Sequence, residues 1–173
     1  MAYISNAVEY GLHCLLYLSE SPTGREGYTV RSLAAFQGVP KDYLAKIFTK
    51  LHKAGLVIAT EGVTGGFVLA RPAEEISVLD VIEAIDAHKP FFECRDIREK
   101  CALFEEGASP QWATDGVCAI HAVMLEVEKK MKQELDRYTL SSLKKAFVKK
   151  APDEFLDQMD KWFHMFSPQG KMR

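Results

Sequence analysis

A close succession of two short helical patterns and two short β-prone runs most restricts how this chain can fold. Thr29 opens the first helical pattern, Gly38 ends it, and Pro40 begins the second. The apolar runs 56–59 and 67–70 flank a glycine-containing turn and predict a β-hairpin. Two short helices followed by a hairpin predict a winged helix-turn-helix, and the expected fold class is mainly α with a small β-hairpin.

Apolar side chains at helical spacing predict further helices on both sides of this region. The ranges concerned are 3–20, 76–87, 117–138 and 140–150. Residues 88–116 have no sustained period, and a stretch this long and irregular is usually functional or disordered. Residues 151–173 predict either one more helix or a loosely docked tail. The helix over 117–138 carries one apolar seam among charged residues, which favours pairing with a second copy of the chain.

Length and composition exclude several classes of protein. The 173 residues suffice for one domain or two small ones, and 47% of them are hydrophobic. No apolar run approaches the ~18–20 residues that a membrane-spanning helix needs. The N-terminus lacks a basic segment before its apolar stretch, so we expect no secretory signal, no membrane partner and a cytoplasmic protein. The net charge of −2 argues at first against a nucleic-acid partner.

Splitting the charge by segment changes that interpretation. Residues 1–72 hold seven Lys and Arg against five Asp and Glu, and residues 40–54 hold four Lys against one Asp. The basic helix therefore lies where a helix-turn-helix presents its reading surface to the major groove. Lysines on a helix are more often only a solvated face, but the hairpin favours DNA binding. The predicted DNA-binding residues are Arg31, Lys41, Asp42, Tyr43, Ala45, Lys46, Lys50, Lys53, Thr64 and Gly65.

Three of the four cysteines form a second constellation. Cys94, Cys101 and Cys118 are followed by His121, and their neighbours are polar. Thiolates, with histidine as an occasional replacement, are the usual ligands of iron–sulfur clusters, whereas zinc sites prefer two tight pairs. The remaining cysteine, Cys14, lies among leucines and is expected to be a buried packing residue.

These motifs carry a resemblance to a known family over residues 1 to about 145. They are Tyr43-Leu44-x-x-Ile47-Phe48-x-x-Leu51-x-x-x-Gly55-Leu56-Val57, Gly62-x-x-Gly65-Gly66-Phe67-x-Leu69-Ala70-Arg71, and the three cysteines with His121. The chain resembles the IscR-type family of bacterial winged-helix transcription regulators, in its iron–sulfur cluster-binding subset. The resemblance implies a homodimer crossed through the long helix, a pseudo-palindromic operator in double-stranded DNA, and a cluster, 2Fe–2S in preference to 4Fe–4S.

The sequence departs from the family pattern in two places. Glu61 stands where the family usually has an arginine for the minor groove, and the gap between Cys101 and Cys118 is longer than usual. The fourth cluster ligand stays open. His121 matches one position that the family uses, and Glu9 matches another, on the first helix of the partner subunit. His13 lies one turn after Glu9 on the same face.

The domain boundaries and the function follow as expectations. Residues 1–72 are predicted to form the DNA-binding domain, 73–150 the cluster-binding loop and dimerisation helix, and 151–173 a C-terminal helical extension or tail.

The expected function is a DNA-binding transcriptional regulator, a repressor, whose operator affinity depends on an iron–sulfur cluster that senses redox, nitric oxide or iron status. A thiol-based regulator without a cluster is the alternative. An electron-transfer protein or a cofactor-free partner-binding module ranks lower. The chain has no glycine-rich phosphate loop, nucleophile elbow or HExxH motif, so no enzyme is expected.

Overall fold

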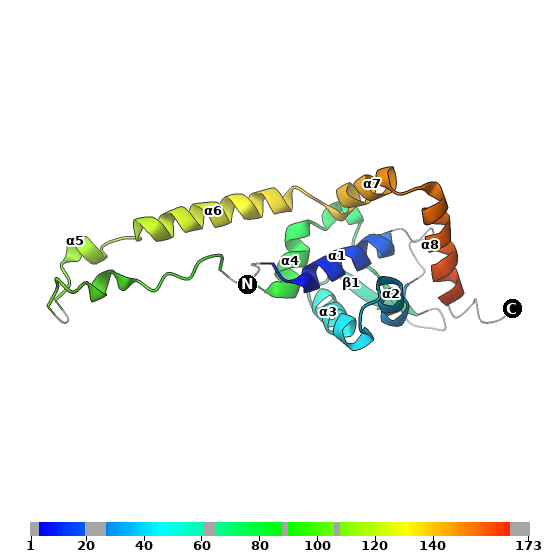
Figure 1. The fold of residues 1–173 in the computed structure, drawn as a ribbon, viewed down its shortest axis with the longest axis horizontal. Coiled ribbons are helices and arrows are strands. Elements are labelled where there is room, and N and C mark those ends of the chain that lie inside the picture. Colours follow the sequence, from blue (N-terminus) through cyan, green and yellow to red (C-terminus); the bar gives the residue numbers. More distant parts are fainter. Residues whose placement is uncertain (1–3, 20–26, 61–64, 88–89, 106–107, 167–173) are drawn as a thin grey trace. The chain divides into compact units, whose positions relative to one another are not determined.

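The computed structural model of the chain describes residues 4–19, 27–60, 65–87, 90–105 and 108–166 (Figure 1). They divide into two compact units, one of residues 1–87 with 135–173 and one of residues 88–134. The helices are α1 (Asn6–Ser19), α2 (Val30–Gln37), α3 (Lys41–Lys53), α4 (Val78–Asp86), α5 (Gln111–Thr114), α6 (Ala119–Asp136), α7 (Leu140–Lys150) and α8 (Asp153–Phe166). The strands are β1 (Val57–Thr60) and β2 (Gly66–Leu69).

The predicted fold class, mainly α with a two-stranded hairpin, is confirmed. The Thr29 hydroxyl accepts a hydrogen bond from the Ser32 backbone N–H at 3.0 Å and caps α2, as its sequence position indicated. Gly38 ends α2 with a φ of 67°, a left-handed conformation that glycine adopts without a steric penalty. Pro40 precedes α3, so helix α3 starts one residue later than expected.

The two strands form an antiparallel hairpin that we call the wing. Its register pairs Val57 with Leu69 and Thr60 with Gly66. Tyr28, just before α2, adds one further antiparallel bridge to the outer side of β2 at Phe67. Residues 61–64 at the turn of the wing, including Glu61 and Thr64, lie outside the described residues.

The hydrophobic core lies in the first unit, where α1 packs on α3, α4 and α7, and α2 packs on α3. Cys14 is 0% exposed within it, which confirms its prediction as a packing residue. Ser77 and Asp80 form a capping box at the start of α4. The Ser77 hydroxyl accepts a hydrogen bond from the Asp80 backbone N–H, and the Asp80 carboxylate accepts one from the Ser77 backbone N–H. The backbone on either side of Ser77 bonds to the chain at the start of α7: Val78 donates to the Tyr138 carbonyl at 2.8 Å, and Leu140 donates to the Ile76 carbonyl at 2.9 Å.

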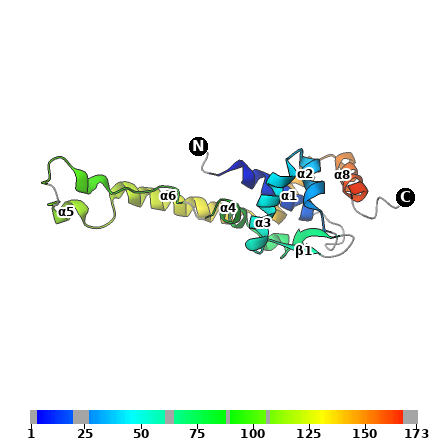
Figure 2. The same cartoon turned by 90° about the horizontal axis from the view of Figure 1, so that it is seen from below.

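The segment after α7 is a docked helix. Figures 1 and 2 show α8 beside α2, and the side chains of Met159 and Phe163 are each only 3% exposed. Of the two alternatives that the sequence left for residues 151–173, the helix is therefore the one that the structure contains over Asp153–Phe166. Among the residues described, no helix is long and apolar enough to cross a lipid bilayer.

Candidate nucleic-acid interface and cysteine segment

Helix α3 has a buried face and an exposed face. Leu44, Ile47, Phe48 and Leu51 are each at most 3% exposed, because they repeat at helical spacing and anchor α3 in the core. The exposed side chains of its first half belong to Lys41, Asp42, Tyr43 and Lys46, and Ala45 is half-buried between them. The residues predicted to face DNA bases therefore lie together on the solvent side of one rigid helix.

Three further predicted DNA-binding residues belong to parts of the chain outside α3. Arg31 is exposed in the first turn of α2, and Gly65 directly precedes β2. Thr64 lies outside the described residues. The Tyr43 ring is held edge-on to that of Tyr10 from α1, with ring centroids 5.9 Å apart, which orients an exposed aromatic side chain at the start of α3.

The basic residues in the second half of α3 differ from one another. The Lys50 ammonium donates a hydrogen bond to the Ile85 carbonyl near the end of α4, at 2.5 Å. His52 Nδ1 lies 3.0 Å from the Val57 carbonyl at the start of β1. Lys53 is exposed in the last turn. Lys50 and His52 thus join α3 to its neighbours, a role that the sequence did not indicate.

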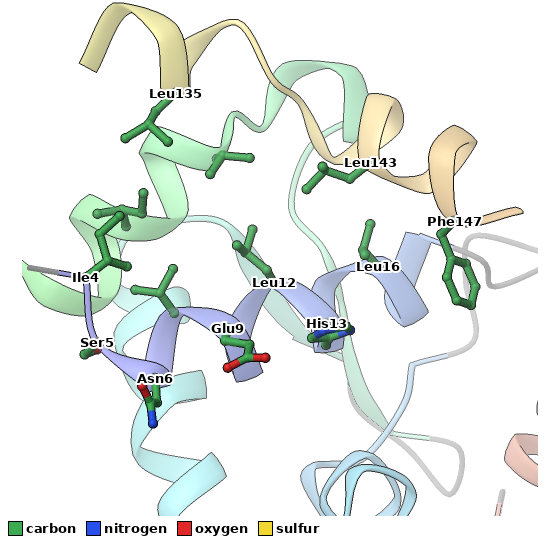
Figure 3. Close-up of a pocket in the computed structure, with 13 residues that line it drawn as sticks. Ile4, Ser5, Asn6, Glu9, Leu12, His13, Leu16, Leu135, Leu143 and Phe147 are labelled. Atoms are coloured by element: carbon green, nitrogen blue, oxygen red, sulfur yellow. The ribbon is translucent and has the colours of Figure 1, made fainter. Parts of the chain in front are cut away.

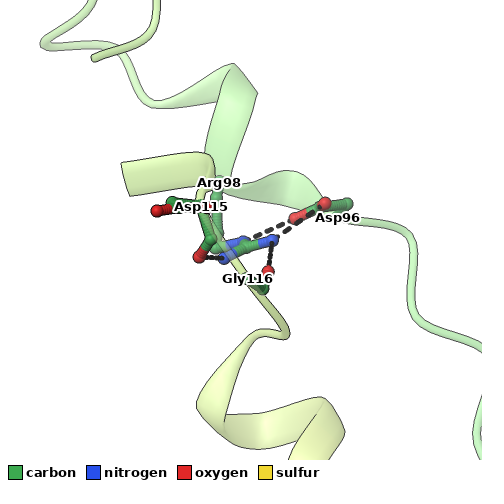
Figure 4. A network of polar contacts seen from close by, with 4 residues as sticks. All are labelled: Asp96, Arg98, Asp115 and Gly116. Atoms are coloured by element: carbon green, nitrogen blue, oxygen red, sulfur yellow. Dashed lines mark hydrogen bonds and ion pairs between the residues drawn. The ribbon is translucent and has the colours of Figure 1, made fainter. Parts of the chain in front are cut away.

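In the second unit, one arginine connects two stretches of residues 94–121, which we call the cysteine segment (Figure 4). Arg98 donates from Nε to Asp96 Oδ1 at 2.6 Å and from Nη2 to Asp96 Oδ2 at 3.0 Å. The same guanidinium donates to the carbonyls of Asp115 at 3.5 Å and Gly116 at 3.2 Å. The chain around residues 96–98 is therefore fastened to the chain that leads into α6.

This connection brings two of the predicted ligands together. Cys94 and Cys118 line one cavity of about 190 Å³, with Phe92, Ile97 and Arg98 among its other walls. Cys101 is exposed and does not line this cavity. The chain folds Cys94 and Cys118 to the same place although 23 residues separate them in the sequence.

The thiol of Cys118 lies at the N-terminal end of α6. The backbone N–H groups of His121 and Ile120 hold its pKa below the ordinary thiol value, because they stabilise the thiolate, and the Arg98 guanidinium acts in the same direction. Asp96 opposes this shift but is itself paired with Arg98. Cys118 is consequently the cysteine most suited, by its surroundings, to react or to bind a metal as thiolate.

The donor set of a cluster is only partly assembled. The ring of His121, one of the candidate ligands, lies beside that of Phe92, with centroids 6.1 Å apart. Within the described part of the chain, no three His, Cys, Asp or Glu side chains gather closely enough to hold a metal ion. Cys94 and Cys118 offer two thiolates, but Cys101 does not complete them, so the described protomer does not fit a fully ligated cluster.

Glu9 and His13 lie on one exposed face of α1, in the first unit. Both border an apolar groove of about 530 Å³ between α1, α4 and α7, as Figure 3 shows. The apolar walls of this groove are Ile4, Val8, Leu12, Leu16, Val78, Ile82, Leu135, Leu143 and Phe147. The pair shares a face as its spacing predicted, but within the described residues no third ligating group accompanies it.

Sequence reasoning missed Arg98, the residue that organises the cysteine segment. Its signal was present, because Asp96 and Arg98 carry opposite charges and both lie between Cys94 and Cys101. Neither the spacing of the cysteines nor their polar neighbours could show that the same guanidinium also bonds to residues 115 and 116. Those bonds join residues 17 and 18 positions apart.

Comparisons with known proteins connect this arrangement to one family. The sequence profile of the Rrf2 family, described as an iron-dependent transcriptional regulator, matches residues 4–146. Protein rrf2 of Nitratidesulfovibrio vulgaris is 32% identical over 138 residues, which cover 78% of this chain and 81% of that protein. The structure of CymR, the global cysteine regulator of B. subtilis, matches with a TM-score of 0.64 and 23% identity, over 84% of this chain and 98% of that one. T. potens IscR matches with a TM-score of 0.62 and 24% identity, over 90% and 96%. At these identities the two structures show a shared fold.

Proposed function

We propose a function from one premise: this chain belongs to the Rrf2 family of winged-helix transcription regulators. The proposed protein is a repressor that binds a pseudo-palindromic operator in double-stranded DNA as a homodimer. Its operator affinity depends on the chemical state of the cysteine segment, residues 94–121. The observation that carries DNA binding is the exposed face of α3. Lys41, Tyr43 and Lys46 lie on this face in the N-terminal half of the helix, and the other face is buried.

The chemistry of that face suits DNA. A reading helix meets base edges with its first turns, and lysines further along meet phosphates, where each contact releases counterions. Lys46 and Tyr43 are proposed as base-reading residues, and Lys53 as a phosphate contact. Lys50 is a weaker candidate for a phosphate contact than its charge indicates, because its ammonium is bonded to the Ile85 carbonyl.

Two apolar surfaces support the homodimer. Helix α6 exposes Ile120, Val123 and Val127 at helical spacing, with exposed fractions of 63%, 60% and 44%. The groove beside α1 is a second apolar surface. Exposed apolar stripes of this kind are typical of interfaces between subunits. A dimer would present two α3 helices to two half-sites of one operator.

The sensing centre is proposed at the cavity that Cys94 and Cys118 line. One form of the proposal is an iron–sulfur cluster, 2Fe–2S rather than 4Fe–4S, supported by the spacing of the three cysteines with His121. A cluster would supply a redox-active group whose loss or oxidation changes the charge at this place. Because the described protomer brings together only two of the thiolates, this form requires further ligands. The candidates are Cys101 as the third thiolate, and His121 or the Glu9 or His13 of a second copy as the fourth ligand.

A thiol-based form is the second candidate, and one observation favours it. Cys118 has a lowered pKa and lines the same cavity as Cys94, so an oxidant could convert this pair between dithiol and disulfide without a metal. Each thiol loses one proton and one electron to the oxidant as the S–S bond forms.

One experiment separates these forms and tests the function. The protein is purified without oxygen, iron and acid-labile sulfide are measured, and visible absorption and EPR spectra are recorded. An operator is selected from a random duplex library, and its affinity is titrated before and after oxidation. Iron and sulfide in equal amounts support the cluster. Their absence, with a Cys94–Cys118 disulfide after oxidation, supports the thiol form. Equal affinity in every state contradicts sensing, and failure to select any duplex contradicts the function.

Cysteine variants provide the matched control. Cys94→Ala and Cys118→Ala are expected to abolish the response of operator affinity in either form. Cys101→Ala is expected to abolish it only if a cluster is present, because Cys101 does not line the cavity. All three variants leave α3 unchanged and should still bind DNA.

A further inference from the structure

Helix α8 lies beyond the residues that the family profile matches. The match ends at residue 146, whereas α8 covers Asp153–Phe166. Its packing is nevertheless close, since Met159 and Phe163 belong to the core of the first unit. Helix α8 therefore lies outside the region that the profile matches, and the position of its buried side chains indicates what the helix does.

Phe163 and Trp162 meet three aromatic rings of the helix-turn-helix, and we call these five residues the aromatic cluster. The ring of Phe163 stacks on that of Tyr28 at 4.2 Å and 14°, and lies 4.8 Å from Phe36 and 5.9 Å from Tyr17. Trp162 lies 4.9 Å from Phe36. Phe163 thus touches rings from α1, from α2 and from the residue that leads into α2.

Tyr28 connects the aromatic cluster to the wing. Its backbone N–H donates to the Phe67 carbonyl at 3.1 Å, and the Phe67 N–H donates back to the Tyr28 carbonyl at 2.9 Å. The approach is close: a Cβ atom on Gly66 would lie 2.7 Å from the carbonyl carbon of Tyr28. Only glycine fits there, so the backbone of β2 is pressed directly against residues 27 and 28.

The wing needs such support. It has two strands of four residues each, and a two-stranded hairpin alone is marginally stable in water. The Tyr28 bridge adds a third partner on the outer side of β2. Inside the fold, the Phe67 ring lies 4.9 Å from that of Phe48 on α3. Contacts therefore run from Phe163 through Tyr28 and Phe67 to the helix proposed to read DNA.

We propose that α8 positions the wing for DNA binding, and that Phe163 is a positioning residue that acts through Tyr28. This inference rests on the proposed function, because it assigns a role in operator binding. Without the Phe163 ring, one face of Tyr28 loses its apolar cover, and the two bonds between Tyr28 and Phe67 open more often. A wing that samples several orientations must be ordered when DNA binds, which weakens the complex.

A direct contact between α8 and DNA is a poorer explanation for an effect of α8 on operator affinity. The helix carries Asp153, Glu154, Asp157 and Asp160 against only Lys161 and His164. Phosphates repel a helix of this charge. An influence of α8 on affinity is therefore expected to pass through Tyr28 and β2.

The test compares Phe163→Ala with Phe155→Ala in the full-length chain. Both variants make the same chemical change on α8, but Phe155 is 43% exposed and its ring lies beside that of Phe147, not in the aromatic cluster. Amide hydrogen exchange is measured at Tyr28 and Phe67, whose N–H groups form the two bonds, and at Leu44 and Ile47 in α3. Operator affinity is measured on the same samples. Phe163→Leu keeps most of the buried volume and serves if Phe163→Ala does not fold.

Phe163→Ala is expected to speed exchange at Tyr28 and Phe67 by about tenfold, the size of effect that an aromatic pair supplies. Exchange at Leu44 and Ile47 should rise by a smaller factor, because α3 keeps its own buried face, and operator affinity should fall by about tenfold. Phe163→Leu should act in the same direction with smaller size, and Phe155→Ala should match the original chain.

Three results overturn the inference. They are unchanged exchange at Tyr28 and Phe67, equal acceleration in α3, which means general destabilisation, and unchanged affinity despite faster exchange. The exchange measurement needs no DNA. If the original chain binds no duplex, the proposed function fails together with the DNA-binding role of α8, and the exchange data still decide whether α8 holds the wing.

Discussion

At the scale of single residues, the four cysteines differ because their surroundings differ. Cys14 is enclosed by leucines, and burial raises the pKa of its thiol to about 12. Cys118 lies at a helix N-terminus beside a guanidinium, which lowers the pKa of its thiol. The same functional group is thus a packing residue at one place and a candidate reactive thiolate at another.

The lowered pKa of Cys118 predicts its alkylation profile. In the reduced, metal-free protein, the rate of iodoacetamide modification at Cys118 should rise with pH with a midpoint below the ordinary thiol pKa of about 8.5. Arg98→Gln should move this profile toward higher pH, because it removes one positive charge from beside the thiolate. Mass spectrometry of quenched samples measures the rate. A midpoint at or above the ordinary value contradicts the prediction.

Cys14 predicts the opposite behaviour. It should remain unmodified at pH 8 in the native protein and react fully in urea, because both burial and its raised pKa suppress the thiolate. Cys14→Ser should lower the free energy of unfolding by about 1–3 kcal/mol, since it buries a hydroxyl in an apolar site. Urea denaturation followed by circular dichroism measures this change. Equal modification of Cys14 and Cys118 under native conditions would show that the core opens easily.

At the scale of elements, α3 combines the exposed face proposed to read DNA with connections to its neighbours. Lys46 and Lys53 are exposed, whereas Lys50 is bonded to the last turn of α4. Helix α4 ends at Asp86, shortly before the second unit begins at residue 88. This bond therefore links α3 to the helix that directly precedes the unit with the three cysteines.

Three alanine variants distinguish these roles. Lys46→Ala should reduce discrimination between operator and random DNA, by about 1–3 kcal/mol. Lys53→Ala should weaken binding to all sequences and lower the salt slope by about 1. Lys50→Ala should lower the free energy of unfolding by about 1 kcal/mol, because an exposed charged hydrogen bond is lost, and should change the salt slope less. Affinity titrations at several salt concentrations, with thermal unfolding, measure these effects. Identical behaviour of Lys50→Ala and Lys53→Ala would contradict this assignment.

At the scale of the whole molecule, the expected active species is a dimer of the 19.5 kDa chain. Val123 lies in the exposed apolar stripe of α6. At about 100° per residue, Ala122 is turned by about 100–160° away from the stripe residues Ile120, Val123 and Val127. The two positions are therefore suited to a matched pair of charge substitutions.

Val123→Glu should shift the protein from dimer to monomer and weaken binding to a two-half-site operator by at least about tenfold. Its affinity for a single half-site should change little, because α3 is untouched. Ala122→Glu adds the same charge outside the stripe and should remain dimeric. Analytical ultracentrifugation gives the oligomeric state. A dimeric Val123→Glu protein would mean that the stripe on α6 is not the interface.

Most of the fold could be predicted because its signals are local. The Thr29 cap, the left-handed Gly38 and the apolar spacing of α3 each depend on residues within one or two turns, and all three are present. The boundaries shifted by one to three residues, and by one residue in the strands of the wing. The candidate site was predicted less completely. The exposed face of α3 lies where expected, whereas only Cys94 and Cys118 of the three cysteines share a cavity.

The amino-acid sequence by itself determined the order of helices, the hairpin, the position of the basic helix α3 and the separation of Cys14 from the other cysteines. These features follow from periodicity, capping and local charge. Only the tertiary structure decided that Lys50 bonds to Ile85, that Arg98 fastens residue 96 to residues 115 and 116, and that Phe163 stacks on Tyr28. The physical reason is sequence distance. Partners between 17 and 135 positions apart leave no mark in a local pattern, because they meet only once the chain between them has folded.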